Sequence, residues 1–414
     1  MDKTSKPVIA CQICEKKELE SILFLGYLPP VNQMHDIGTQ PVEQASYPAE
    51  LLYCNNCHLV QLGLVVDKEV LFPSEYPYTS STTKVLRDNF ADLYNECSGI
   101  LKLEQDDLVV DIGSNDGNLL NNFQKHHRVL GITPEEIGKL AIERGIPTII
   151  DYFIESVVEK VKKEHGKAKL ITATNVFAHI DNVNQITELI LDLLHDDGVF
   201  ISESHYLLPL IQTLQYDTIY HEHMRYYSLH SLKYLFEQHG LQIFHVKEIP
   251  SHGGSIRVYC SQQGKYEVQE TVRVQLAIEK ETVIGTENFK KFQNNVVLSK
   301  LELHSLLCEI KEKGESICAI GAPSRGSTLV NYVGLDDGII DYVCEIKGSH
   351  KIGKYLPGTL IPVVEEQIMY EKQPDYAFFL SWHIADELIP KFREKGFGGR
   401  FIVPLPEARV ISRI

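Results

Sequence analysis

DLVVDIGSNDGNLLNNF, residues 107–123, reads as a buried strand, a glycine-rich turn and the start of a helix. An amphipathic helical pattern precedes it at residues 82–101, and helical stretches such as residues 182–197 follow it. Short apolar runs lie between these helices: RVLGITP (128–134), PTIIDYF (147–153), KLITATNVF (169–177) and GVFISES (198–204). Strands that alternate with helices predict a doubly wound parallel α/β sheet, whose ligand lies at the carboxyl ends of the strands.

The turn inside this stretch differs from the dinucleotide pattern GxGxxG, because the next glycine after Gly113 is Gly117. With Asp111, Asn115 and Asp116 it spells D-x-G-x-N-D-G, a pattern typical of methyltransferases that use S-adenosylmethionine (SAM). Glycines let the backbone approach a ligand, and acidic groups can receive the ammonium group of SAM. The turn therefore predicts a SAM site.

The second strand ends differently from the usual SAM site. That strand normally ends in Asp or Glu, which accepts hydrogen bonds from both ribose hydroxyls, whereas here Thr133 stands at its end. A threonine can make one such bond but no bidentate pair. Either Glu135 or Glu136 compensates, or the affinity for the cofactor is weaker.

Composition limits the class of protein. The chain has 414 residues, enough for two or three domains, and its 43% hydrophobic and 23% charged residues are those of a soluble globular protein. The formal charge of −16 argues against a nucleic-acid partner. An apolar run long enough for a membrane helix is missing, as is a signal-peptide core, so we expect a cytoplasmic protein without a membrane partner.

Two CxxC pairs stand near the N-terminus, Cys11–Cys14 and Cys54–Cys57. Each pair lets two thiolates converge on one ion, and two pairs complete a tetrahedral zinc site. The 39 residues between them exceed the usual zinc-ribbon spacing. Four unrelated reduced thiols are the alternative. Four cysteine ligands leave no position open for water, so the predicted zinc is structural.

YHEHMRYYS, residues 220–228, crowds one glutamate, two histidines, three tyrosines and an arginine together. The zinc-protease signature H-E-x-x-H fails here, because Arg225 stands where the second histidine would be. Such a cluster either lies on a polar surface or faces a site where protons move. His179 and Glu203, at strand ends near the expected cofactor, contact the ligand or are structural.

The C-terminal half repeats the strand–loop–helix pattern in SICAIGAPSRGSTLVNY, residues 316–332. Its loop resembles a P-loop without the lysine, which argues against an NTPase but suits the cradling of an unreacting diphosphate. Arg325 could clamp phosphate oxygens, and the cationic run at residues 347–354 could add positive charge. The alternative interpretation of this run is a solvated loop. Trp382 is either a core residue or a wall on which a base stacks.

Over almost its whole length the chain resembles the nucleotide-sugar C-methyltransferases, typified by the C-3 methyltransferases that make branched deoxysugars. The resemblance rests on the CxxC pairs, DIGSNDG and YHEHMRYYS, and on five further motifs: YPYTSST (76–82), NVFAHIDNV (175–183), HGGSIRVY (252–259), GAPSRGSTLVNY (321–332) and YLPGTLIP (355–362). It departs from the family at Thr133 and at Ser324-Arg325, where small residues followed by lysine are expected.

The resemblance implies three units: a zinc-binding N-terminal domain (1–75), a central Rossmann-like SAM methyltransferase domain (76–265) and a second Rossmann-like α/β domain (266–414) that holds the substrate's nucleotide. It implies cofactor contacts at Asp111, Gly113, Asn115, Asp116, Gly117, Leu119, Thr133, Asn175, Val176 and His179. It implies substrate contacts at Ser255, Arg257, Arg325, Gly326, Ser327, Thr328, Asn331, Lys347, His350, Lys351, Lys354 and Trp382.

The implied reaction is SAM-dependent methylation at C-3 of a nucleotide-linked, dTDP-type 4-keto-6-deoxyhexose. His223 is then the general base, and Glu222 orients it or binds a sugar hydroxyl. The enolate would be stabilised by Tyr220, His221, Tyr76 and Tyr78. The alternatives are a small-metabolite O- or N-methyltransferase and a catalytically decayed, zinc-stapled nucleotide-binding module. We expect a monomer, because three domains can bury one another's surfaces.

Overall fold

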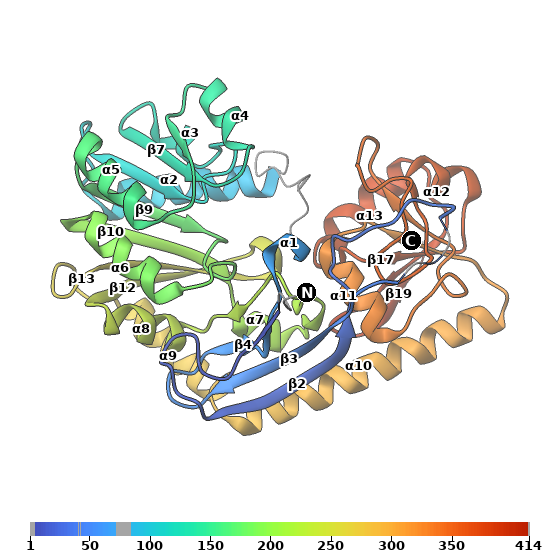
Figure 1. Ribbon diagram of the computed structural model, residues 1–414. Helices are drawn as coiled ribbons and strands as arrows, with labels where there is room; N and C mark the ends of the chain where they lie inside the picture. Colours follow the sequence, from blue (N-terminus) through green and yellow to red (C-terminus); the bar gives the residue numbers. More distant parts are fainter. Residues whose placement is uncertain (1–4, 40, 42, 72–83, 413–414) are drawn as a thin grey trace.

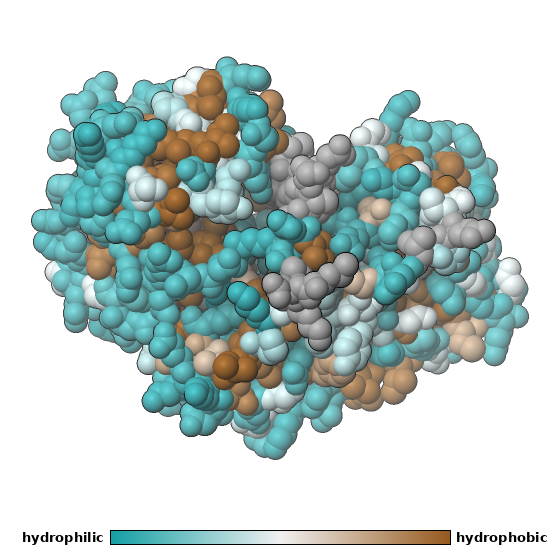
Figure 2. All heavy atoms as spheres, viewed as in Figure 1, coloured by the Kyte–Doolittle hydropathy of each residue, from teal (hydrophilic) through white to brown (hydrophobic). Residues whose placement is uncertain are grey.

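The computed structural model describes residues 5–39, 41, 43–71 and 84–412 of the chain. Tyr76 and Tyr78, both predicted to stabilise the enolate, lie outside these residues. The two larger sheets lie in separate lobes, and strands β2 and β3 together with the long helix α10 run beneath both (Figure 1). The molecular surface is indented between the lobes (Figure 2). No helix in the described ranges combines the length and apolarity needed to cross a bilayer.

The N-terminal unit is built on an antiparallel sheet in the order β11-β4-β3-β2. Its strands are β2 (Leu19–Leu28), β3 (Tyr47–Cys54), β4 (Val60–Leu62) and β11 (Arg225–Tyr226). A short ribbon pairs β1 (Lys6–Pro7) with β5 (Leu64–Val65), and helix α1 (Lys68–Leu71) follows. The fourth strand, β11, therefore comes from the YHEHMRYYS segment, far along the chain.

The central sheet has seven strands in the order β12-β13-β10-β9-β6-β7-β8. They are β6 (Leu108–Ile112), β7 (Arg128–Thr133), β8 (Thr148–Ile150), β9 (Ala168–Thr174), β10 (Leu194–His205), β12 (Leu241–Ile249) and β13 (Ser255–Gln262). All residues of β6 are buried, as expected of a parallel strand covered on both faces. Strands β13 and β12 pair antiparallel at one edge, an addition to the parallel sheet that the sequence predicts.

Helices cover this sheet and connect it to the rest of the chain. They are α2 (Lys84–Ile100), α3 (Leu120–Phe123), α4 (Gly138–Glu143), α5 (Glu155–His165), α6 (Val183–Leu193), α7 (Leu207–Gln212), α8 (Leu229–Gln238) and α9 (Glu270–Thr282), with 3₁₀ turns η2 (Tyr216–Thr218) and η3 (Ser251–Gly253). Because α9 packs on β12, the chain remains with the central sheet to this point. Helix α10 (Thr286–Glu312) then leads to the other lobe.

The C-terminal sheet has six strands in the order β16-β15-β14-β17-β18-β19, parallel except for β19. They are β14 (Ile317–Ile320), β15 (Tyr342–Glu345), β16 (Val363–Glu365), β17 (Tyr376–Phe379), β18 (Arg400–Val403) and β19 (Arg409–Ile411). Its helices are α11 (Ser324–Val333), α12 (Gln367–Lys372) and α13 (Ala385–Glu394), with the 3₁₀ turn η4 (Trp382–Ile384). The strand order reverses at β14, where α11 starts, and in such sheets ligands bind at this switch point. The α/β class with a second Rossmann-like sheet is confirmed.

The segment after β2 lies against the C-terminal unit. The amide of Tyr355 donates to the carbonyl of His35 at 2.7 Å, and the amide of Ile37 donates to the carbonyl of Gly353 at 2.8 Å. The N-terminal unit therefore contacts both lobes, and one continuous apolar core runs through all three units.

Candidate active site

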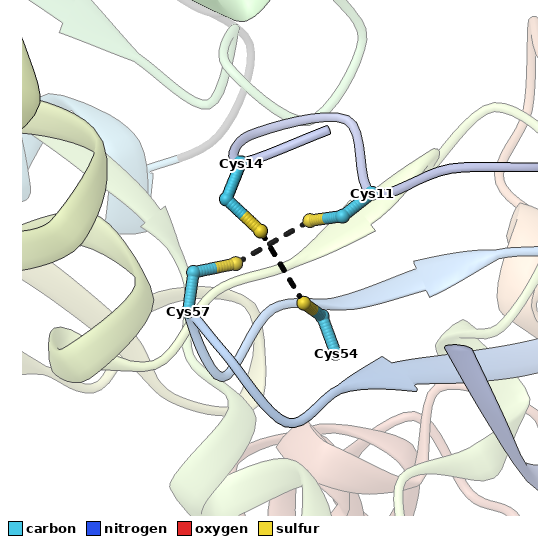
Figure 3. Close-up of side chains that lie close together, drawn as sticks. All are labelled: Cys11, Cys14, Cys54 and Cys57. Atoms are coloured by element: carbon cyan, nitrogen blue, oxygen red, sulfur yellow. Dashed lines mark hydrogen bonds between the residues drawn. The ribbon is translucent and has the colours of Figure 1, made fainter. Parts of the chain in front are cut away.

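The four predicted zinc ligands come together. Their Sγ atoms lie within 4.8 Å of one another, with 3.3 Å between Cys11 and Cys57 and 3.4 Å between Cys14 and Cys54 (Figure 3). Zinc–sulfur bonds of about 2.3 Å in a tetrahedron need sulfurs roughly 3.8 Å apart, so a small adjustment admits the ion. The β2–β3 hairpin occupies the long gap between the two CxxC pairs, which explains the unusual spacing. The donor set and its geometry fit structural zinc.

The zinc site is docked on the central unit. The side-chain amide of Asn184, at the start of α6, donates at 3.0 Å to the backbone carbonyl of Ile13, which lies between the zinc ligands Cys11 and Cys14. On the other side, the amide of Gln12 donates to the side chain of the buried Gln61 at 2.9 Å. Gln61 lies on β4, directly opposite Arg225 of β11. The zinc site thus stabilises the strand against which the YHEHMRYYS segment is paired.

The N-terminal sheet holds the YHEHMRYYS segment by backbone and side-chain contacts. The amide of Leu62 donates to the carbonyl of Met224 at 2.9 Å, and the ring Nε2 of His221 donates to the carbonyl of Pro48 at 3.2 Å. His221 is buried against this sheet with its ring edge-on to Tyr47 at 5.7 Å. The structure therefore gives His221, predicted to stabilise an enolate, contacts that fix the segment.

His223 has the tautomer of a base. Its Nδ1 lies 3.0 Å from the carbonyl of Thr218, and since a carbonyl only accepts, Nδ1 carries the proton in the neutral ring. Nε2 then keeps its lone pair. Burial, with His179 nearby, lowers the pKa of His223 well below its ordinary value, so the ring is neutral at pH 7. The Tyr220 ring lies 4.2 Å from the His223 ring, centroid to centroid.

His179 lies beside His223 and is fixed in the same way. The ring centroids are 5.1 Å apart, and Nδ1 of His179 donates to the carbonyl of Glu222 at 2.7 Å. Burial lowers the pKa of His179. The loop that carries His179 is held by the buried Arg225, which donates to the carbonyls of Ile180 at 2.5 Å and Asp181 at 2.7 Å. Arg225 therefore has a structural task at the position where a zinc protease has its second histidine.

Glu222 is 4% exposed and lies where the three units meet. From the N-terminal unit, the side-chain amide of Asn32 donates to Oε1 of Glu222 at 2.6 Å. From the C-terminal unit comes Lys351, whose ammonium donates to the carbonyl of Ala322 at 2.6 Å. Burial lowers the pKa of Lys351, and the carboxylates of Glu345 and Glu222 oppose that shift. Sequence reasoning missed Asn32, because an asparagine after a proline pair carries no chemical signal.

The glycine-rich loop after β6 is closely packed. Gly113 has φ +74°, and a Cβ there would lie 2.5 Å from Cγ2 of Val176, so the position requires glycine. Asp111 is buried and accepts a hydrogen bond from Thr172 at 2.7 Å, and burial raises its pKa to about 7. Asp116 is buried and paired with Arg144 at 2.9 Å. Both carboxylates support the loop from beneath, so its backbone is the surface offered to a cofactor.

Glu135 is the carboxylate that lies beside this loop. Thr133 is 2% exposed, and its methyl group packs where a Cβ on Gly138 would lie 2.7 Å away. The side chain of Asn115 hydrogen-bonds to Glu135, whose pKa is raised by burial. Glu136 instead pairs with the exposed Lys139. Of the two carboxylates after the second strand, Glu135 lies beside the glycine-rich loop and Glu136 lies at the surface.

Two predicted substrate residues of β13 lie inside the central unit. Arg257 is fully buried, with Nε 3.1 Å from Glu203 and Nη1 2.7 Å from Glu96 of α2. Its Nη2 donates to Asn89 at 2.9 Å. The hydroxyl of Ser255 donates to the backbone of η3. The Arg257 contacts anchor α2 on β13, a role different from the predicted substrate contact.

Arg325 and Trp382 converge on Asp217 of η2. Arg325 donates through Nε at 2.7 Å and Nη2 at 2.8 Å, and the Trp382 indole donates at 2.7 Å. The guanidinium also lies 5.0 Å from the Trp382 ring. Arg325 was predicted to clamp phosphate oxygens, and Trp382 to be either a core residue or a wall on which a base stacks. The structure buries both against a shared carboxylate that links the two lobes. Nothing in the sequence singled out Asp217.

The remaining predicted substrate residues separate into two groups. Gly326, Ser327 and Thr328 are buried in the first turns of α11, and the amide of Asn331 donates to the carbonyl of Pro357 at 2.9 Å. In the cationic run, Lys347 and His350 are exposed, and Lys354 pairs with Asp36 across a backbone bridge. Lys351 is the member of the run whose charge interacts with Glu222. Three further histidines that prediction omitted, 205, 252 and 383, lie near Arg325, with pKa values lowered by burial.

Comparisons with known proteins bear on this arrangement. Family models match residues 11–72 (a zinc binding domain), 84–246 (a methyltransferase domain) and 250–406 (C-methyltransferase C-terminal domain). C-methyltransferase NovU of Streptomyces niveus is 33% identical over 419 residues, covering 100% of this chain and 99% of NovU. Among solved structures, magnesium protoporphyrin IX methyltransferase of Synechocystis with bound SAM gives a TM-score of 0.33 at 12% identity, covering 43% of this chain and 79% of that one. A putative-methyltransferase complex with the Trm112 activator of Haloferax volcanii gives 0.34 at 13% identity, covering 42% of this chain and 93% of that one.

Proposed function

The chain belongs to the C-methyltransferase family, and from that premise we propose that it methylates C-3 of a nucleotide-linked 4-keto-6-deoxyhexose. It is a SAM-dependent enzyme with a structural zinc site. The proposal adds the acceptor, its carbon and the dTDP group. The observation that supports it most is the tautomer of His223, which the carbonyl of Thr218 fixes.

Carbon is a poor nucleophile until a proton leaves it. A 4-keto group acidifies the C–H bond at C-3, and a neutral imidazole with a free Nε2 lone pair can take that proton. The electron pair of the C–H bond then moves into the enolate, and C-3 becomes the nucleophile. Oxygen and nitrogen acceptors already carry a lone pair, whereas carbon has no electron pair to donate until the proton is removed, so a fixed neutral base at His223 supports a carbon acceptor.

SAM supplies the electrophilic methyl group, and the chain supplies the alignment. The backbone of the loop at residues 113–117 and the carboxylate of Glu135 would hold the cofactor over the sheet. Tyr220 lies beside His223, where its hydroxyl can stabilise the charge on the enolate oxygen, whereas the proton of the neutral His179 ring is held by the carbonyl of Glu222. The proton on His223 returns to solvent after transfer, which leaves the methylated ketone and S-adenosylhomocysteine.

The substrate's nucleotide would lie near the start of α11, at the switch point of the C-terminal sheet. Helix N-termini favour anions, and the sheet's geometry supports a diphosphate there. Lys351 adds a cation between this place and the catalytic cluster in a chain of net charge −16. A diphosphate-linked sugar placed there would extend toward Glu222 and His223.

The test is mass spectrometry of the protein incubated with SAM and dTDP-4-keto-6-deoxyglucose. We expect a product in which one methyl replaces one hydrogen, and none with His223→Ala. Without SAM in heavy water, wild type should still exchange the C-3 proton and the variant should not. Tyr227→Phe is the matched control, because it removes a buried polar group of the same segment whose hydroxyl is already used by the backbone carbonyl of Phe177.

Methylation that survives in His223→Ala would remove His223 as the base and favour an oxygen or nitrogen acceptor. If wild type methylates no keto-sugar nucleotide, the proposed substrate class is wrong. A product methylated elsewhere than C-3 would refute the assigned carbon only.

A further inference from the structure

Glu222 accepts its amide hydrogen bond from a different folding unit. Asn32 follows β2 and a proline pair in the N-terminal unit, and its Nδ2 lies 2.6 Å from Glu222 Oε1. A hydrogen bond to a carboxylate is about twice as strong as one between neutral groups, and shorter. The contact is also sheltered, because Glu222 is 4% exposed.

The two residues lie next to the two edge strands of the N-terminal sheet, β11 and β2. Glu222 is fixed by its own segment, since β11 pairs with β4 and the carbonyl of Glu222 accepts from His179 at 2.7 Å. Asn32 is fixed by the turn that leads from β2 to the C-terminal unit, where the next residue, Gln33, donates from its side chain to the carbonyl of Val70 at 3.1 Å. Their meeting is therefore set by the addition of β11 to the N-terminal sheet rather than by local chain geometry.

The groups that face Glu222 make the chemical identity of residue 32 important. Lys351 brings a positive charge from the C-terminal unit, and His179 and His223 lie nearby as neutral rings. An amide adds a donor without adding a charge. Aspartate at position 32 would set two carboxylates within hydrogen-bond reach, and two such groups cannot both ionise freely.

We propose that Asn32 is a positioning residue of the active site, which holds the Glu222 carboxylate in the orientation that the reaction requires. What Glu222 then does, whether it orients His223 or binds a sugar hydroxyl, rests on the proposed function. The zinc-bound unit thus contributes a side chain to the site in addition to supporting it. Asn32 acts through Glu222 and touches no reacting atom.

The decisive experiment measures the coupling of residues 32 and 222 without any sugar substrate. Thermal unfolding of the full-length zinc-loaded chain is followed at pH 5.5 and 8.5 for wild type, Asn32→Asp, Glu222→Gln and the double variant. In Asn32→Asp one carboxyl group of the pair keeps its proton to a higher pH than in the unfolded chain. Its favourable contribution is present at acid pH and lost as the pH rises through that raised value.

We therefore expect Asn32→Asp to melt about 2–4 °C lower, relative to wild type, at pH 8.5 than at pH 5.5. In the Glu222→Gln background this extra loss should vanish. The matched control is Asn184→Asp, which also converts a partly buried side-chain amide into a carboxylate but lies against the carbonyl of Ile13. It should destabilise the chain without an alkaline loss that depends on residue 222.

Turnover supplies the readout that a merely structural residue would not move. Asn32→Ala should lower kcat about tenfold or more while zinc content and SAM affinity remain those of wild type. The deficit of Asn32→Asp should grow toward alkaline pH, and that of Asn32→Ala should not. Serine at position 32, which keeps a donor, should recover part of the loss.

Two results would overturn the inference. One is an Asn32→Asp melting difference that is the same at both pH values or persists in Glu222→Gln. The other is Asn32→Ala with wild-type kcat on any substrate the enzyme accepts. Because the coupling needs no substrate, an enzyme that rejects every keto-sugar nucleotide would refute the proposed function and still leave Asn32 tested.

Discussion

Removing the Asp217 carboxylate should separate the two lobes. Asp217 is fully buried, and it receives two charge-assisted hydrogen bonds from Arg325, whose side chain is 8% exposed, and one from the Trp382 indole. In Asp217→Ala the guanidinium stays buried without its counter-charge, which costs about 3–5 kcal/mol. The unsatisfied indole N–H moves the expected loss to the upper part of that range.

The assay uses a property of the chain itself. Trp382 is its only tryptophan and lies at this junction, so its fluorescence during urea unfolding reports the contact between the lobes directly. In Asp217→Ala the fluorescence transition should move to lower urea and separate from the transition seen by far-ultraviolet circular dichroism. Adding Arg325→Met should recover much of the loss, because no buried charge is then left unpaired.

An ion pair at the surface provides the control for the Asp217 and Arg325 variants. Lys290 and Glu287 pair at 2.8 Å but are 61% and 87% exposed, so Lys290→Met should leave the urea midpoint close to that of wild type. The reasoning is refuted if Asp217→Ala unfolds like wild type. If Arg325→Met leaves stability unchanged but raises the KM for a nucleotide sugar more than tenfold, Arg325 binds phosphate, as its place in the loop predicts from sequence.

Three further predictions concern the active site. Cys57→Ser or a strong chelator should abolish zinc binding and methylation but weaken SAM binding less. The reason is that β4 pairs with the YHEHMRYYS segment, whereas the glycine-rich loop lies on another sheet; loss of SAM binding, measured by calorimetry, to the same extent as methylation would contradict this. Burial lowers the pKa of His223 well below 6.5, so kcat should stay level through pH 6.5 and fall only at more acid pH, where the base becomes protonated. An acid limb with its midpoint at or above 6.5 would be inconsistent with this. Glu135→Gln should raise the KM for SAM about tenfold, because a charged acceptor for the ribose hydroxyls is lost. Glu136→Gln should leave this KM unchanged, because that carboxylate pairs with Lys139 at the surface; equal effects of the two variants would refute the assignment of Glu135.

Local chemistry made part of the molecule predictable. The strand–turn–helix at residues 107–123 and the CxxC pairs need particular residue types at short spacing, because a left-handed turn requires glycine and a metal requires thiolates. The fold class and the zinc ligands follow from such signals.

Contacts between distant segments were not predictable from local patterns. The pairing of Arg225 with Gln61 depends on how whole units pack, and no periodicity in either segment signals it. Asp217 and Arg257 illustrate a second reason, since an acidic or basic residue looks the same in sequence whether it meets a ligand or a buried counter-charge. Tyr76 and Tyr78 remain predictions.

The borrowed strand β11 also bears on the order of events during synthesis. The ribosome completes β2, β3 and β4 early, and at about 5–20 residues per second roughly 10–30 s pass before β11 emerges. During that interval β4 presents an unpaired edge, the kind of surface that recruits strands from other chains. In a nascent chain that binds zinc promptly, the ligands Cys54 and Cys57 hold the start of β4 in place. The metal would then matter for the yield of folded protein as well as for the finished site.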